Sequence, residues 1–314
     1  MPAGDPATSS HIDPMSMPSN PTTGQLPVIF DRDLVRARRS RAVSRGEGDS
    51  FLNDFVVPEL ADRLSLINRQ FQTSAVIAAD AVRCATTLGM GQMLGNVITA
   101  DVTLGGSGQV ICDEEFLPFR PESLDCIVSS LTLHWINDLP GALIQMRRAL
   151  KPDGLMIAGL LGGDTLSELR TCLLLAETSS SAGASPRVSP FLDVREAGGL
   201  LQRAGFALPV VDADRLTVRY RDPLALMRDV RAMGAANALA SRSRRPLRRD
   251  VLMEACRLYA EQHSDPDGRI RATFQVIYLT GWAPHESQQK PLRPGSAQAR
   301  LADALSVVER KFPR

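Results

Sequence analysis

The fold of this chain is indicated by three motifs, Asp113-Glu114-Glu115-Phe116-Leu117-Pro118-Phe119, Leu124-Asp125-Cys126-Ile127-Val128-Ser129-Ser130 and Leu150-Lys151-Pro152-Asp153-Gly154, which follow one another between residues 113 and 159. The middle motif is an apolar run of strand length, as expected of a strand buried on both faces of a parallel sheet. The acidic motif before it and the Lys-Pro-Asp-Gly turn after it are typical of the second half of a nucleotide-binding α/β domain.

On both sides of this stretch, short apolar runs alternate with helical periods, which is the pattern of βαβ units. Strands are expected near 75–79, 96–100, 109–112, 124–130 and 154–161, with helices near 82–93 and 138–150. Further along we expect helices near 165–178 and 194–204, a strand at 208–220, a helical insertion at 223–264 and a last strand at 273–282. The prediction is a doubly wound, mostly parallel α/β sheet whose last two strands close one edge.

The rest of the chain divides into tails and N-terminal helices. Residues 1–29 and 291–314 are expected to be tails, and 71–290 to form the α/β domain. Between them, 30–70 is expected to hold a basic helix followed by an amphipathic one, with Pro58 either kinking the second helix or standing in its first turn.

Composition excludes several classes of protein. The net charge of +1 argues against a dedicated nucleic-acid binder. The five cysteines form no Cys-x-x-Cys pair, which favours a reducing compartment and no zinc site. No apolar run approaches the roughly 20 residues of a membrane span, and the first 26 residues lack the features of a secretion signal or mitochondrial presequence. A soluble, cytoplasmic protein is expected.

Together with Leu133-His134-Trp135, the opening motifs resemble those of Rossmann-like, class I S-adenosylmethionine-dependent methyltransferases. This resemblance implies a cofactor site at the carboxyl ends of the strands. Asp101, at the end of the second strand, would accept the ribose hydroxyls; the alternative is an ordinary polar strand end. Asp113 and Glu114 would receive the adenine, or else form a solvated strand terminus. Phe116 and Phe119 would flank the purine or belong to the core.

The loop after the first strand departs from the methyltransferase pattern. Where glycines would let backbone N–H groups approach the ligand, the sequence has Ala79, Ala81 and Arg83. Arg83 would enter the pocket, pair with Asp80 or Asp101, or bind a carboxylate ligand; alternatively the loop is shifted in register, with Gly89 or Gly91 serving another turn. We therefore expect weakened binding of S-adenosylmethionine.

A narrower resemblance rests on motifs spread from residue 30 to about 297. They are Phe30-Asp31-Arg32-x-Leu34-x-Arg36-x-Arg38-Arg39, Leu133-His134-Trp135-x-Asn137-Asp138-Leu139-Pro140, Gly162-Gly163-Asp164-Thr165-Leu166-x-Glu168-Leu169-Arg170, Ser189-Pro190-Phe191 and Gly281-Trp282-x-x-His285-Glu286-Ser287-Gln288. The set is similar to the methyltransferase-fold complex I assembly factor 5 family and its bacterial relatives. The resemblance implies a protein substrate, with hydroxylation of an arginine in the NADH dehydrogenase subunit that holds the last iron–sulfur cluster. A non-catalytic assembly chaperone and a carrier-protein or small-molecule methyltransferase of the biotin-synthesis type are the alternatives.

Few side chains are candidates for chemistry. His134 follows the fourth strand and is either a general base or a packing partner of Trp135. Asp164 follows the fifth strand at the same edge. Glu168 completes a Thr-x-x-Glu capping box with Thr165, so a structural role is expected for it. The histidines suited to metal binding are His134, His263 and His285, and this set predicts no tightly bound metal.

Arginines gather in two runs, Arg32–Arg45 and Arg242–Arg249. Most charge runs are solvated faces. With a net charge near zero and no interleaved aromatic residues, an acidic protein surface or anionic lipid headgroups are favoured over nucleic acid. Peripheral association with the inner membrane through these basic helices is one expectation.

Overall fold

The computed structural model describes residues 27–45, 51–89, 93–103, 109–180 and 183–289. Most of the two expected tails lies outside these ranges. Residues 27–29 are described, and Ile29 is joined to the body of the protein because its carbonyl oxygen accepts a hydrogen bond from the Ala240 N–H at 2.8 Å.

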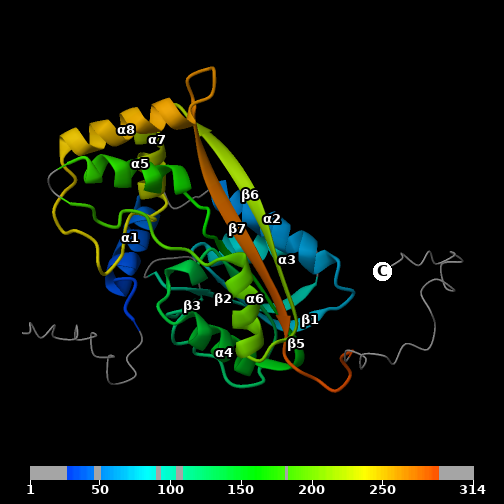
Figure 1. Ribbon diagram of the computed structural model, residues 1–314. Helices are drawn as coiled ribbons and strands as arrows, with labels where there is room; N and C mark the ends of the chain where they lie inside the picture. The colour runs from blue at the N-terminus through cyan, green and yellow to red at the C-terminus, as the bar shows by residue number, and fades with distance from the viewer. Residues whose placement is uncertain (1–26, 46–50, 90–92, 104–108, 181–182, 290–314) are drawn as a thin grey trace, which may run out of the picture.

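A seven-stranded sheet with the order β3-β2-β1-β4-β5-β7-β6 forms the centre of the molecule (Figure 1). The first five strands are parallel, and β7 runs antiparallel to both β5 and β6. The strands are β1 (Phe71–Ala78), β2 (Leu94–Asp101), β3 (Val110–Ile111), β4 (Leu124–Ser130), β5 (Leu150–Leu161), β6 (Ala207–Tyr220) and β7 (Ile270–Trp282). The predicted doubly wound sheet and its closing pair of strands are confirmed.

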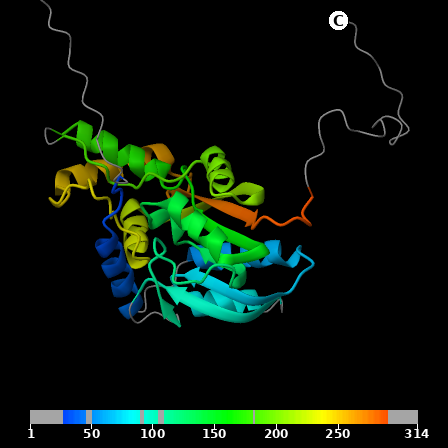
Figure 2. The same ribbon diagram turned by 90° about the horizontal axis from the view of Figure 1, so that it is seen from below.

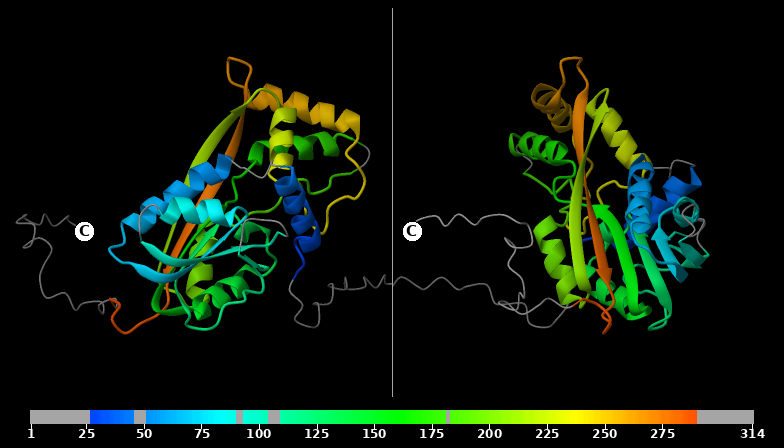
Figure 3. Two further views of the ribbon diagram at one scale, coloured as in Figure 1. Left: turned by 180° about the vertical axis from the view of Figure 1, so that it is seen from behind. Right: turned by 90° about the vertical axis from the view of Figure 1, so that its right-hand side faces the viewer.

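Helices cover both faces of the sheet, as the edge-on view in Figure 3 shows. α2 (Phe51–Ser65) and α3 (Ala81–Gly89) pack on one face, in a core with Val76, Val128 and Ile157. α4 (Leu139–Ala149) and α6 (Val194–Arg203) pack on the other, in a core that includes Ile77 and Ile127. Alternate residues of the inner strands enter opposite cores, which explains why these strands read as continuous apolar runs.

The β6–β7 pair is longer than the rest of the sheet and carries a third cluster of helices. β7 pairs with β5 only from Val276 to Trp282, while its pairing with β6 continues to Ile270. Against the extended part pack α5 (Ser167–Thr178), α7 (Pro223–Ala232) and α8 (Arg249–His263), with Phe274 and Tyr259 in their shared core. Figures 1 and 2 show these helices gathered at one end of the sheet, next to α1 (Arg32–Ser44).

The expected insertion at 223–264 is helical only at its two ends. Residues 233–248 between α7 and α8 form a loop rather than a helix. Gly234 begins this loop with φ of +73°, and a β-carbon there would lie 3.2 Å from the Arg38 carbonyl oxygen. Only glycine combines that backbone angle with such a close approach to α1.

The starts of two helices differ. Asp31 caps α1, since its side chain accepts from the Leu34 N–H at 3.1 Å. The capping box at Thr165 and Glu168 is wrong. Thr165 exchanges hydrogen bonds with Gln275, and Glu168 accepts from the Thr273 N–H at 3.2 Å. Both side chains tie the loop after β5 to β7, so the structural role expected of Glu168 is confirmed by another contact.

Pro58 lies inside α2 rather than in its first turn. Within the described ranges, none of the helices is both long enough and apolar enough to cross a lipid bilayer.

The helical cluster on the β6–β7 extension depends on Phe274. Its side chain is 2% exposed, and its ring meets that of Phe51 edge to face at 5.4 Å. We expect Phe274→Ala to lower the free energy of unfolding by about 3–5 kcal/mol, because the cavity cannot collapse between two packed layers. Met253→Ala, at a side chain that is 54% exposed, is the control and should cost about 0.5 kcal/mol or less. Urea denaturation midpoints test this, and equal shifts in the two variants would contradict it.

Candidate functional site

The segment before α1 is fixed to the loop that follows β4. The Asn137 Oδ1 accepts from the N–H groups of Ile29 at 2.8 Å and Phe30 at 2.7 Å, and its Nδ2 donates to the Phe30 carbonyl oxygen at 3.2 Å. The Phe30 ring packs edge to face on Trp135 at 5.6 Å. The Trp-x-Asn part of the motif therefore places the start of α1 at the carboxyl edge of the sheet.

At this edge, α1 contributes a guanidinium group to the acidic motif that follows β3. The Arg32 Nη2 lies 2.6 Å from Asp113 Oδ1 and 2.5 Å from Glu114 Oε2, and its Nη1 donates to the Trp135 carbonyl oxygen at 2.9 Å. Burial would lower the pKa of Arg32, but attraction by Glu114 and Asp113 outweighs it and raises that pKa. The group is a permanent cation held between two carboxylates.

Two further arginines of α1 complete the network. Arg39 Nη1 lies 3.2 Å from Glu114 Oε1, with both side chains buried, and Arg36 Nη2 lies 3.2 Å from Asp113 Oδ2. Burial acts to raise the pKa of Asp113, but the Glu115 N–H and Arg32 reverse the effect and the pKa is lowered. The two acids expected to receive adenine thus already hold three cations from α1.

Asp101 has a different environment. It is 2% exposed, its Oδ1 accepts from the Thr103 N–H at 2.9 Å, and its Oδ2 has no hydrogen-bond partner among the described residues. Burial raises the pKa of Asp101, although the Thr103 hydrogen bonds oppose the shift. A buried carboxylate oxygen without a partner is costly, and a ligand hydroxyl would satisfy it.

The turn after β1 forms without glycine. The described residues with positive φ do not include any between 78 and 83, so alanine is compatible with this backbone. Ala81 is fully buried in the core beneath α2, whereas Ala79 is half-buried. The Arg83 Nη2 reaches Asp54 of α2 at 2.5 Å, and its N–H donates to Asp80 Oδ1 at 3.3 Å. Arg83 is therefore held at the α2–α3 surface.

These placements fit S-adenosylmethionine at one end only. The free oxygen of Asp101 suits the ribose hydroxyls of an adenosyl group. Asp113 and Glu114 do not present free acceptors to an adenine amine while Arg32 and Arg39 remain in place. Asp101 thus has an acceptor for a ligand hydroxyl, whereas Asp113 and Glu114 are engaged by arginines of α1.

A second cavity opens beside the end of β5, between the sheet and the third cluster of helices. Its volume is ≈ 80 Å³ and its walls are mainly apolar and aromatic, with Asn237 among the few polar residues. The lining residues are Leu52, Trp135, Leu161, Thr165, Leu166, Leu169, Arg187, Val188, Ser189, Phe191, Val230, Met233, Ala235, Asn237 and Phe274. We call this the apolar pocket.

His134 supports two walls of the apolar pocket. Its ring packs against Trp135 at 5.3 Å and against Phe191 at 5.9 Å, and its Nδ1 accepts from the Leu161 N–H at 3.4 Å. Burial and then the charge of Arg39 lower the pKa of His134 well below its usual value, so the ring is neutral near pH 7. With Nδ1 accepting, the proton lies on Nε2, which makes the ring a donor rather than a base.

Asp164 lies outside the lining of the apolar pocket. Its side chain is 48% exposed and forms an ion pair with Arg215 of β6. Its backbone N–H donates to Gln275 Oε1 at 3.1 Å. Asp164 directly precedes the lining residue Thr165, but its carboxylate lies at the surface.

The remaining expected residues are dispersed. Phe116 is 76% exposed, while Phe119 packs on the core beside α4. His263 packs on Tyr259 at the end of α8, and His285 bonds to Ser287 in the loop after β7. In the part of the chain that the structure describes, no three His, Cys, Asp or Glu side chains converge as a metal site would require.

The Arg32–Glu114 pair and the role of Asn137 were not predicted from the sequence. Arg32, Asp113 and Asn137 all belong to motifs quoted above, so the residues themselves were recognisable. Nothing in the spacing showed that motifs 81 and 107 residues apart meet.

Comparison with known proteins gives the following similarities. A family model described as a methyltransferase domain matches residues 76–158. Arginine-hydroxylase NDUFAF5, mitochondrial, of Homo sapiens is 40% identical over 297 residues, which are 91% of this chain and 85% of that protein. The protein of the same name from Danio rerio is 38% identical, with 89% and 90% covered. A malonyl-acyl-carrier-protein O-methyltransferase from Methylovorus is 30% identical, with 90% and 95% covered.

The ion network predicts unequal effects for two neighbouring arginines. Arg32→Ala leaves Glu114, which is 1% exposed, with Arg39 as its remaining cation, and we expect a loss of about 2–4 kcal/mol in unfolding free energy. Arg36→Ala is the matched control; its side chain is 40% exposed, so the loss should stay below about 1 kcal/mol. Thermal and urea unfolding measure both, and equal losses would show that the network does not hold α1.

Proposed function

Since the chain belongs to the arginine-hydroxylase NDUFAF5 family, within the class I methyltransferase superfamily, we propose that it hydroxylates an arginine of a protein substrate. One oxygen atom of dioxygen would enter a C–H bond of the arginine, and an external two-electron reductant would reduce the other oxygen atom to water. The substrate we propose is a subunit of respiratory complex I, an NADH dehydrogenase subunit, modified during assembly. The observation that carries the proposal is identity of 38–40% over about nine-tenths of the chain.

The apolar pocket has suitable chemistry for an arginine side chain. A guanidinium group stacks on aromatic faces, and its three methylenes pack on apolar walls. Trp135 and Phe191 supply such faces, while Ser189 and Asn237 add polar groups to the lining. We propose that the target arginine enters here, at the carboxyl edge of the sheet where ligands of this architecture bind.

The two candidates for chemistry receive separate roles in this proposal. His134 holds Trp135 and Phe191 in place and offers an N–H donor, so it acts as a positioning residue. Asp164 belongs to a surface ion pair with Arg215 and takes no part in catalysis.

Mass spectrometry of the complex I subunit tests the function. In cells that lack this protein, the peptide with the substrate arginine should be lighter by the mass of one oxygen atom, because the proposed hydroxylase is missing. Re-expression of the wild-type chain should restore it. An unchanged mass together with poor assembly of the complex would instead identify a non-catalytic chaperone.

Two variants of the re-expressed protein locate the chemistry. Phe191→Ala removes one aromatic wall of the apolar pocket and should leave less than about a tenth of the modification, equivalent to at least 1.4 kcal/mol. Asp164→Asn is the comparison and should restore full modification. If Asp164→Asn restored less modification than Phe191→Ala at equal amounts of folded protein, the reaction would be assigned to Asp164 rather than to the apolar pocket.

For the cofactor, we propose that S-adenosylmethionine binds at Asp101 but more weakly than in a methyltransferase with free adenine contacts. Ala79 and Ala81 in the turn after β1, and the cations on Asp113 and Glu114, support weak binding. The carboxylate of Asp101 would hold the ribose of the bound cofactor through its unpartnered oxygen.

Titration calorimetry measures this binding. We expect an affinity weaker than micromolar for the wild type, and a further loss of roughly tenfold in Asp101→Asn, which removes a charged acceptor. Asp214→Asn, at an exposed carboxylate, should bind as the wild type does. Micromolar binding would contradict the proposal and favour an active methyltransferase, as would methylation of malonyl carrier protein.

The setting follows from the same premise. We propose work on the cytoplasmic side of the bacterial inner membrane, where the substrate subunit is assembled. We also propose that residues 71–290 form the α/β domain, and that the N-terminal helices at 30–70 complete it.

A further inference from the structure

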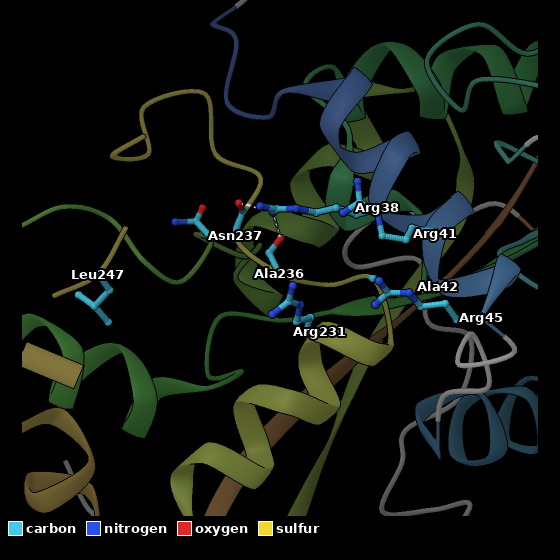
Figure 4. A pocket seen from close by; sticks show the side chains of 9 residues that line it. Arg38, Arg41, Ala42, Arg45, Arg231, Ala236, Asn237 and Leu247 are labelled. Atoms are coloured by element: carbon cyan, nitrogen blue, oxygen red, sulfur yellow. Dashed lines mark hydrogen bonds between the residues drawn. The ribbon is translucent and has the colours of Figure 1, made fainter. Parts of the chain in front are cut away.

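A cavity with a very different lining lies on the other side of the loop at 233–248. Its volume is ≈ 540 Å³, and four arginines contribute to its walls together with Asn237 and other residues. Arg38, Arg41 and Arg45 come from α1 and its C-cap, and Arg231 comes from the last turn of α7. Figure 4 shows side chains from both helices directed toward a common space. We call this the arginine pocket.

The positive charge of the arginine pocket is not balanced locally. Among the residues that the structure describes, Arg41, Arg45 and Arg231 form no ion pair, and no carboxylate lines the cavity. The ends of α1 and α7 supply about half a negative charge each, roughly one in total against four guanidinium charges. About three positive charges remain without a counter-charge from the described residues.

Arg38 is held in position for a ligand. Its Nη1 donates to the carbonyl oxygens of Ala236, at 2.7 Å, and Asn237, which fixes the plane of the guanidinium. Burial lowers the pKa of Arg38, and repulsion by Arg242 and Arg41 adds to the effect, while Asp31 opposes it. The cation is therefore less favourable here than in water, and an incoming anion would offset the repulsion between the arginines.

The arginine pocket adjoins the apolar pocket. Asn237 lines both cavities, and the short segment from Gly234 to Asn237 contributes residues to each. An extended polypeptide advances about 3.3 Å per residue, so neighbouring residues of one chain would reach both cavities.

We propose that the arginine pocket binds an acidic segment of the protein substrate, adjacent to the residue that enters the apolar pocket. Paired carboxylates match the planar donors of several guanidinium groups. That the ligand is a segment of the substrate rests on the proposed function. That the cavity binds a polyanionic peptide rests on the arginine pocket alone.

Other anionic partners fit less well. Nucleic-acid sites add aromatic side chains on which bases stack, and the described residues that line this cavity include no aromatic one. A membrane surface would meet a flat cationic face, whereas these charges surround a cavity, and Arg32, Arg36 and Arg39 of the same helix are turned inward onto acids. The expectation that the whole basic helix faces a membrane is therefore not favoured.

Binding of a fluorescein-labelled hexaglutamate peptide to the full chain, followed by fluorescence anisotropy, tests the proposal. We expect saturable binding that weakens roughly tenfold or more in Arg41→Glu/Arg231→Glu, because two attractive charges become repulsive. Arg195→Glu/Arg203→Glu makes the same change in net charge on exposed residues of α6 and should stay within about twofold of the wild type. Unchanged melting temperatures confirm that each variant is folded.

Three results would overturn the proposal. The first is absence of saturable peptide binding, and the second is equal weakening in the two double variants. The third is that millimolar inorganic phosphate or phosphatidylglycerol vesicles displace the labelled peptide more effectively than unlabelled glutamate peptide does. Arg41→Lys/Arg231→Lys should give intermediate affinity, since lysine keeps the charge without the planar donor pair. The assay does not depend on modification. Normal peptide binding with no arginine mass increment would therefore reject only the proposed function, and the reverse pair of results would reject only the acidic-segment site.

Discussion

The ion pair between Arg32 and Glu114 is the contact on which the site depends. Glu114 is 1% exposed, and a charge buried to that degree costs several kcal/mol unless cations and hydrogen bonds surround it. Arg32 and Arg39 provide those cations, and both belong to α1. Docking of α1 then determines where Arg38 meets the loop at 233–248, and this loop separates the two cavities. α1 and its C-cap carry three of the four arginines of the arginine pocket, so the docking of α1 builds most of the positive wall of that cavity.

The Arg32–Glu114 pair also explains why the fold alone does not identify the reaction. The sheet is that of a Rossmann-like class I methyltransferase fold, and one carboxylate oxygen of Asp101 has no partner among the described residues. Asp113 and Glu114 are neutralised by an internal helix. The proposed function uses the neighbouring edge, at Trp135 and Phe191, for a side chain of another protein. The similarity to both arginine hydroxylases and O-methyltransferases is consistent with one scaffold that serves different reactions.

Sequence periodicity was sufficient for the sheet, because each buried strand carries a continuous apolar run between glycine-rich or acidic turns. β4 has the predicted bounds, and β5 differs only by an earlier start at Leu150. Local sequence patterns gave wrong predictions where the hydrogen-bond partner is distant in sequence. Thr165 and Glu168 have the spacing of a capping box, yet both side chains form hydrogen bonds with β7, which a local pattern cannot predict. The candidate site was predictable only at Asp101. The partners of Asp113 and Glu114 stand on α1, and pairing across 81 and 82 residues is decided by tertiary structure.

The wide sequence separation of these contacts also has a consequence for biosynthesis. α1 leaves the ribosome before its partners, which lie 81 residues later at Asp113 and 198 residues later at Ala236. Chain closure over such lengths carries an entropic cost that must be met before the contacts form. Domains fold progressively as the chain emerges, so the sheet can assemble while α1 is still undocked. α1 is thus the first of the described helices to be synthesised, and its contact with the loop at 233–248 forms only after that loop has been made.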